Sequence, residues 1–284
     1  ILSRLMSYTP PVRKQPGTPG GPGGPPAPPK PKAFGEGVKY FEERKGFANY
    51  YYNRLERDRV LASLKKLSDY SSLTGEWAWT GTYDRENRGG DFLVKIEDVK
   101  NPADPTETHP VVTLQFGLTD YKLEPLKQGL TTADLTEPPY TGGLLMALYQ
   151  YKRFLTLGPK GSEGDKCQHA GMEPVYMMPV NGPAPRKFED ARVWCEVIRT
   201  EHAYVPSKWY FYRADLNRQM PGTGPYPDGA LVAGEVYVDG MTDPCELYFS
   251  DFKPVDGRMV PHRMEVRNGD KRYAVFNIKA LQLK

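Results

Sequence analysis

The sequence predicts an α+β fold, a curved antiparallel β-sheet (half-barrel) packed on one or two long helices. Residues 231–284 alternate apolar and polar residues between three turn dipeptides, Asp239-Gly240, Asp256-Gly257 and Asn268-Gly269. Such dipeptides favour hairpins because tight hairpin turns need residues that tolerate positive φ. The same period-two alternation recurs between residues 75 and 116, whereas residues 36–67 and 142–157 have helical spacing. A sheet curved around a helix buries all these apolar faces together.

The N-terminal stretch is predicted to be a disordered Pro/Gly-rich linker. Between Pro10 and Pro31 there are ten prolines and five glycines, which disfavour helices and strands. Residues 1–33 also hold five basic residues and no acidic one, which leaves the rest of the chain at −2 from a total of +3. We therefore expect residues 1–33 to be a linker with the remnant of an upstream domain, and residues 34–284 to be a single α+β domain.

Two segments are predicted to be helical. In residues 36–67, Phe47, Tyr51 and Leu55 recur every four residues, which indicates an amphipathic helix interrupted near Gly46. The neighbouring tyrosines at positions 50–52 are expected to pack in the core, with a stacking platform for a ligand as the alternative. Residues 142–157 form the second helix, which Gly158-Pro159 ends. Its apolar residues in helical register are Leu144, Leu148, Tyr151 and Leu155.

Strands are predicted wherever apolar residues alternate with polar ones. Residues 75–83, 91–97 and 111–116 each place their apolar side chains on one face, which is typical of strands with one buried side. The first two strands are joined through Asn87-Arg88-Gly89-Gly90, a hairpin connection. Residues 159–171 are predicted to be a loop. Further strands are predicted at 175–179, 192–200 and 207–213, before a loop at 221–229 and the closing meander.

Composition excludes several classes of protein. A near-neutral folded part offers no broad basic surface for nucleic acid, so no nucleic-acid partner is expected. No apolar run reaches the ~18 residues of a membrane span. The cysteines, Cys167, Cys195 and Cys245, are too few for a disulfide framework. We expect buried thiols, with one disulfide plus one free thiol as the alternative.

The sequence carries no complete catalytic motif, so no catalytic, cofactor-binding or metal-binding residue is predicted, and no cofactor. There is no G-x-S-x-G, H-E-x-x-H, P-loop or G-x-G-x-x-G pattern. Cys167 and His169 could form half of a metal site but lack a matching pair. The acid pairs, Glu189/Asp190 and Asp243/Glu246, are interpreted as solvated faces. His262 is interpreted as a half-buried structural residue.

The closing stretch, DPCELYFSDFKPVDGRMVPHRMEVRNGDKRYAVFNIKALQLK, resembles the C-terminal part of the LolA/LolB-like superfamily of outer-membrane lipoprotein carriers. The shared pattern is an aromatic strand, an Asp-Gly turn, a strand beginning x-P-x-x, and a final strand that ends in Leu-x-Leu. This resemblance implies a LolA-like half-barrel and an extracytoplasmic location, in the periplasm or cell envelope. It covers roughly the second half of the chain.

Three blocks, 46–61, 140–159 and 243–275, are also similar to the C-terminal region of planctomycete-type proteins that carry a trypsin-like, HtrA-type serine protease region and often PDZ domains. This resemblance implies that the chain is the C-terminal module of a larger serine-protease-like protein. The protease residues would precede Ile1, so none is carried onto this sequence. The implied partners are an upstream protease or PDZ-type domain in the same chain.

Two hypotheses for function follow. The first is a non-catalytic accessory domain that binds a lipid or other hydrophobic ligand, a peptide or a lipoprotein, or that acts as a scaffold if helices fill the concave face of its sheet. The second is a self-contained hydrolase that uses His262 or His202 with nearby carboxylates.

Overall fold

A computed structural model describes residues 39–86, 88–100, 104, 106–162, 166–177, 187–217, 226–269 and 271–284. The predicted linker at residues 1–33 lies outside these ranges. The chain divides into two compact units, Ile1–Glu42 and Glu43–Lys284.

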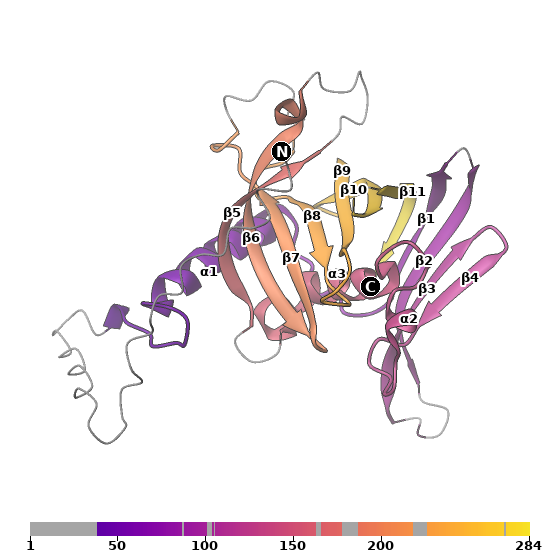
Figure 1. Cartoon of the computed structure of the whole chain (residues 1–284), viewed down its shortest axis with the longest axis horizontal. Coiled ribbons are helices and arrows are strands. Elements are labelled where there is room, and N and C mark those ends of the chain that lie inside the picture. The colour runs from indigo at the N-terminus through magenta and orange to yellow at the C-terminus, as the bar shows by residue number, and fades with distance from the viewer. Residues whose placement is uncertain are drawn as a thin grey trace, which may run out of the picture. The chain divides into compact units, whose positions relative to one another are not determined.

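All the named strands of the second unit belong to one antiparallel sheet (Figure 1). The strands are β1 (Trp77–Arg85), β2 (Arg88–Lys100), β3 (Thr108–Phe116), β4 (Thr119–Leu123), β5 (Gln168–Tyr176), β6 (Arg192–His202), β7 (Val205–Tyr212), β8 (Leu231–Val236), β9 (Cys245–Val255), β10 (Arg258–Asn268) and β11 (Lys271–Leu283). Their order in the 11-stranded sheet is β4-β3-β2-β1-β11-β10-β9-β8-β7-β6-β5. The chain thus builds each half of the sheet from hairpins, and β1 joins the halves by pairing with β11.

The closing meander is confirmed, since β8, β9, β10 and β11 are consecutive neighbours in the sheet. Asp256 and Gly257 have φ of 48° and 77°, the positive values that a tight hairpin turn requires. Gly269 also has a positive φ, of 59°. Asp239-Gly240 instead lies in a longer connection between Val236 and Cys245, where neither residue has a positive φ. Three predicted turn dipeptides therefore mark three real connections, only one of which has positive φ at both residues.

The helices are shorter than predicted. Helix α1 spans Tyr50–Leu67 (18 residues) rather than 36–67, because Asn49 caps it by accepting a hydrogen bond from Tyr51 N at 3.1 Å. Gly46 precedes that cap with a φ of 90°, which is incompatible with a right-handed helix. Helix α3 spans Leu144–Leu157 (14 residues), close to its prediction. The remaining helical turns are short: α2 (Thr132–Leu135), η3 (Gly158–Gly161) and η4 (Phe188–Ala191).

The predicted buried face of α1 is wrong. Its buried residues are Tyr50, Val60 and Leu64, whereas Leu55 is 41% exposed and Tyr52 is 61% exposed. Phe47 lies before the first residue of the helix. The residues spaced by four from it are therefore not the ones that α1 buries. The tyrosines at 50–52 thus divide between core and solvent.

Two strands depart from the sequence prediction. Strand β4 was not predicted, and β5 begins at Gln168, inside a predicted loop. Strand β4 has only five residues and forms the edge of the sheet, so its alternation is too brief to stand out. Strand β5 forms the other edge and carries a register shift between His169 and Met172, which hides its alternation.

Apolar side chains pack on both faces of the sheet. Helix α3 lies inside the curve of the sheet (Figure 1), and its side chains are almost all buried against the inner face. A second cluster, which includes Val193, Cys195 and Val197, lies on the opposite face of the β6–β8 region. The inner face is therefore occupied at its middle by α3, and a ligand site must be sought where that helix does not reach.

Candidate functional site

The centre of the concave face is closed. The hollow beside Tyr151 of α3 and Trp77 and Trp79 of β1 holds only about 10 Å³, room for at most one water. The Tyr151 ring packs edge-on to Trp79 at 5.8 Å and stacks on Phe249 of β9 at 4.8 Å. Helix α3 thus fills this part of the concave face with aromatic contacts.

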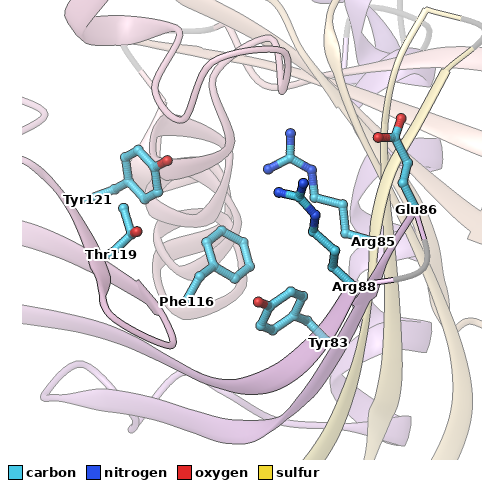
Figure 2. Close-up of a pocket in the computed structure, with 7 residues that line it drawn as sticks. All are labelled: Tyr83, Arg85, Glu86, Arg88, Phe116, Thr119 and Tyr121. Carbon is cyan, nitrogen blue, oxygen red and sulfur yellow. The ribbon is translucent and has the colours of Figure 1, made fainter.

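A larger hollow lies at the far end of the β1–β4 half of the sheet. We call it the arginine pocket; it has a volume of about 400 Å³ (Figure 2). Its lining residues are Tyr83, Arg85, Glu86, Arg88, Phe116, Thr119 and Tyr121. They come from β1, β2, β3 and β4 and from the hairpin turn at Glu86.

The strand pleat places the arginines in this pocket. Arg85 follows Tyr83 by two residues on β1, so both side chains project from the same face of the sheet. Arg88 begins β2 and is paired directly with Arg85 across the hairpin. Glu86 turns the chain between them with φ of 45°. The hairpin therefore sets two guanidinium groups opposite each other at one end of the sheet.

Tyr273 of β11 holds one of these arginines in place. Arg85 donates a hydrogen bond from Nη1 to the Tyr273 hydroxyl at 3.2 Å, and its guanidinium lies 4.2 Å from the centre of that ring. Burial raises the pKa of Tyr273 to about 12, against the opposing effect of Arg85, so its hydroxyl stays protonated. Arg88 is exposed. Within the described part of the chain, neither arginine has a carboxylate within 4.0 Å.

Aromatic rings form the wall of the arginine pocket. Phe116 packs edge-on to Tyr83 at 4.9 Å and to Tyr121 at 6.2 Å, and it stacks on Phe276 at 5.5 Å. The three aromatic residues that line the pocket, Tyr83, Phe116 and Tyr121, also pack against the inner core. The pocket is thus the outer end of the concave face, where the core surface opens to solvent beside two cationic side chains (Figure 2).

The histidines considered for hydrolysis are held by other contacts. His202 Nε2 lies 3.1 Å from the Tyr149 hydroxyl at the end of β6. His262 is half-buried on β10, with Nδ1 3.0 Å from the carbonyl oxygen of Val260. Both histidines lie outside the arginine pocket.

A histidine–carboxylate contact that the sequence did not predict joins His169 and Glu196. His169 Nε2 lies 3.7 Å from Glu196 Oε1, too far for a hydrogen bond. Glu196 also pairs with Arg59 of α1 and with Arg213 Nη1, which is 3.0 Å away. Burial would raise the pKa of Glu196, but His169, Arg59 and Arg213 together lower it to about 2. A carboxylate held this firmly in its ionised form is suited to fastening α1 to the sheet, not to accepting protons at neutral pH.

The predicted acid pairs are not brought together as sites. Glu189 and Asp190 are exposed in η4. Asp243 is exposed, whereas Glu246 is half-buried on the opposite face of the sheet from α3, in a second hollow of about 370 Å³. Burial raises the pKa of Glu246, and the Tyr248 hydroxyl donates to its Oε2 at 2.6 Å.

The cysteines are free and buried, as predicted. Burial raises the pKa of Cys167 to about 11 and raises those of Cys195 and Cys245 further. Across the described ranges, no three His, Cys, Asp or Glu side chains gather as a metal site would require. No helix in those ranges is both long enough and apolar enough to cross a membrane.

Comparison with solved structures gives distant likenesses. No family model matches the chain, and no curated protein matches it. A LolA superfamily protein from Nitrosomonas europaea is 8% identical, with a TM-score of 0.35, over 80% of this chain and 93% of its own. An outer membrane lipoprotein-sorting protein domain from Vibrio parahaemolyticus is 12% identical, with a TM-score of 0.37, over 83% and 94%. A DUF1329 family protein from Desulfovibrio piger is 11% identical, with a TM-score of 0.37, over 81% and 92%.

The sequence resembles both LolA/LolB-like carriers and the C-terminal region of serine proteases. All three structural likenesses are distant in both sequence identity and TM-score. The resemblance to the C-terminal region of serine proteases finds no support among them.

The sequence pointed to none of the arginine-pocket residues as a site. Arg85 and Arg88 read as ordinary charged residues around a hairpin turn. One signal was available in the sequence: Arg85 lies two residues after Tyr83, so a cationic residue follows the apolar residues on one face of the predicted strand. It gains meaning only once β1 is paired with β2.

Proposed function

We propose that residues 43–284 form a non-catalytic binding domain whose ligand site is the arginine pocket. The ligand would be a hydrophobic small molecule, or an apolar group of a lipid, peptide or lipoprotein. The observation that carries this proposal is the open end of the concave face. There an aromatic wall continuous with the core borders a hollow of about 400 Å³, within the range of small-molecule sites.

The packing of α3 supports this location over the middle of the sheet. A carrier needs apolar surface that the protein itself leaves uncovered, and the hollow beside Tyr151 holds only about 10 Å³. Phe116 and Tyr121, in contrast, are only partly buried and border open space. The filled centre of the concave face therefore fits a scaffold, whereas its open end fits a binding site.

Three finer parts of the proposal rest on the sequence. They are an extracytoplasmic location, the division into a linker at 1–33 and a domain at 34–284, and a place at the C-terminal end of a larger serine-protease-like protein. A leader peptide and a protease region in the gene upstream of Ile1 would support the first and last of these. A start codon directly before Ile1 would contradict the last.

Titration with the neutral apolar dye N-phenyl-1-naphthylamine tests the binding proposal. We expect saturable binding, read as a rise in dye fluorescence, at micromolar concentrations. Thr119→Trp should fill the pocket and weaken binding at least about tenfold, because Thr119 is an exposed lining residue whose replacement adds an indole ring there.

Lys122→Trp is the matched control. Lys122 is exposed on the same short strand but alternates with Tyr121, so the new indole would project from the other face. The control should bind the dye like the wild type. Equal affinity of Thr119→Trp and wild type, or no saturable binding by the wild type, would overturn the proposal.

A further inference from the structure

We infer that the arginine pocket recognises an oxyanion on its ligand, a carboxylate or a phosphate attached to an apolar or aromatic body. This inference rests on the proposed function and goes further by naming the chemical class of the ligand. It follows from the charge, the geometry and the surroundings of Arg85 and Arg88.

Neither arginine forms an ion pair with a carboxylate of the described residues. They are direct partners in the β1–β2 register, and like charges directly opposite each other destabilise a strand pair. Other cations of the same sheet have acidic partners: Lys208 lies 2.6 Å from Glu173, and Arg267 lies 2.6 Å from Glu265. No carboxylate of the described residues comes within 4.0 Å of Arg85 or Arg88, although Glu86 lines the same pocket. A bound anion would supply the missing negative charge.

The geometry suits a ligand with two or more acceptor oxygens. Guanidinium groups present paired N–H donors that match the oxygens of carboxylates and phosphates. Tyr273 already holds Arg85 by a hydrogen bond and by ring contact, so little side-chain freedom is lost when Arg85 binds. Arg88 extends from the exposed end of β2 beside the same hollow (Figure 2). One arginine held by Tyr273 and one exposed arginine can thus contact an anion from two strands.

The rest of the pocket defines the remainder of the ligand. Opposite the arginines, the rings of Tyr83, Phe116 and Tyr121 offer an apolar wall, and the Thr119 side chain adds a hydroxyl. A simple inorganic anion would leave this wall uncovered. An acid with an aromatic or alkyl body would cover the wall and pair with the arginines at once.

Calorimetric titration of the full chain with three matched probes tests the inference. The probes are 4-phenylbutyrate, 3-phenylpropyl phosphate and the neutral 4-phenylbutanamide, which share a phenylpropyl group. We expect at least one anionic probe to bind about tenfold or more tightly than the amide. The tighter of the two anions identifies the oxyanion as carboxylate or phosphate. Arg88→Gln and Arg85→Gln should each reduce the preference for the anion and leave the affinity for the amide unchanged.

Lys279→Gln is the matched control, because it removes one positive charge from an exposed position on β11, outside the pocket. It should leave the preference intact. Because Arg85 contacts Tyr273, the Arg85→Gln result counts only if the unfolding midpoint of the variant is unchanged. Arg88 is exposed, so Arg88→Gln tests the inference even if Arg85→Gln is destabilised. Equal affinities for anion and amide in the wild type, or a preference that survives both Arg variants, would overturn the inference. If the neutral naphthylamine dye still binds, the proposed function stands although the inference fails. If the dye does not bind either, both the proposed function and the inference fail.

Discussion

At the scale of single residues, Glu196 is the centre of a charged cluster outside the pocket. Its side chain is only 6% exposed, yet it stays ionised because Arg59 and Arg213 pair with it. Arg59 lies on α1 and Arg213 directly follows β7, so one carboxylate of β6 connects three segments of the chain. Removing one partner of a buried charge pair leaves the others uncompensated, which is costly.

We therefore predict that Glu196→Gln lowers the free energy of unfolding by about 2 kcal/mol at pH 7, a value reduced because Arg59 is partly exposed. The pKa of Glu196 is about 2 in the folded chain, against an ordinary value of 4.5. Its contribution is complete above pH 4.5 and is lost as the pH falls toward 2. Urea unfolding of both proteins at pH 7 and pH 3 measures the difference, which should shrink at pH 3.

Glu56→Gln serves as the control for this prediction. Glu56 also pairs with Arg59, at 2.8 Å, but its side chain is 51% exposed. The change should alter the free energy of unfolding by less than about 0.5 kcal/mol. A Glu196→Gln variant as stable as the wild type at pH 7 would show that the cluster does not fasten α1.

At the scale of elements, the junction of β1 with β11 joins the two halves of the sheet. Its register shifts between Thr80 and Gly81. A Cβ at Gly81 would lie 2.0 Å from the carbonyl oxygen of Asn277, a distance that no side chain can accept. The close approach of the two backbones therefore requires glycine at this position.

We predict that Gly81→Ala lowers the free energy of unfolding by about 3 kcal/mol, because β11 must move away from β1. Gly240→Ala is the matched control, since a Cβ there meets nothing within 4 Å and its φ is not positive. Thermal or urea unfolding of the two variants gives the comparison. Equal stabilities would contradict the importance of this junction.

The sequence predicted elements well where a pattern was long and local. Alternation identified Trp77, Trp79, Phe92, Val94 and Ile96, and all five are buried on the inner core. Helical spacing identified α3, whose ends agree with the prediction to within two residues at the start and none at the end. These patterns are properties of one segment, so they can be read without knowing its neighbours.

Features that depend on pairing could not be predicted in this way. The juxtaposition of Arg85 with Arg88 exists only because β1 and β2 pair in one register. Likewise, the contact of His169 with Glu196 crosses from β5 to β6. Charged residues near turns are usually solvated, so their types alone gave no reason to single them out.

At the scale of the whole folded unit, one sheet serves two purposes. Its inner face is filled by α3 at the centre and opens at the β1–β4 end, where the arginine pocket lies. Its other face carries a second apolar cluster over β6–β8. The pairing of β1 with β2, β2 with β3 and β3 with β4 sets the relative positions of the pocket residues on these four strands. The central claim is that a ligand binds at this open end.

Chemical-shift mapping of the isotopically labelled full chain tests this claim most directly. Titration with the neutral naphthylamine dye should shift the backbone amide signals of Arg85, Arg88, Thr119 and Tyr121 most strongly, because these residues line the arginine pocket. Amides of the second hollow, such as those of Glu235 and Tyr248, should stay in place. Shifts that gather at the second hollow, or no saturable shifts at all, would contradict the account.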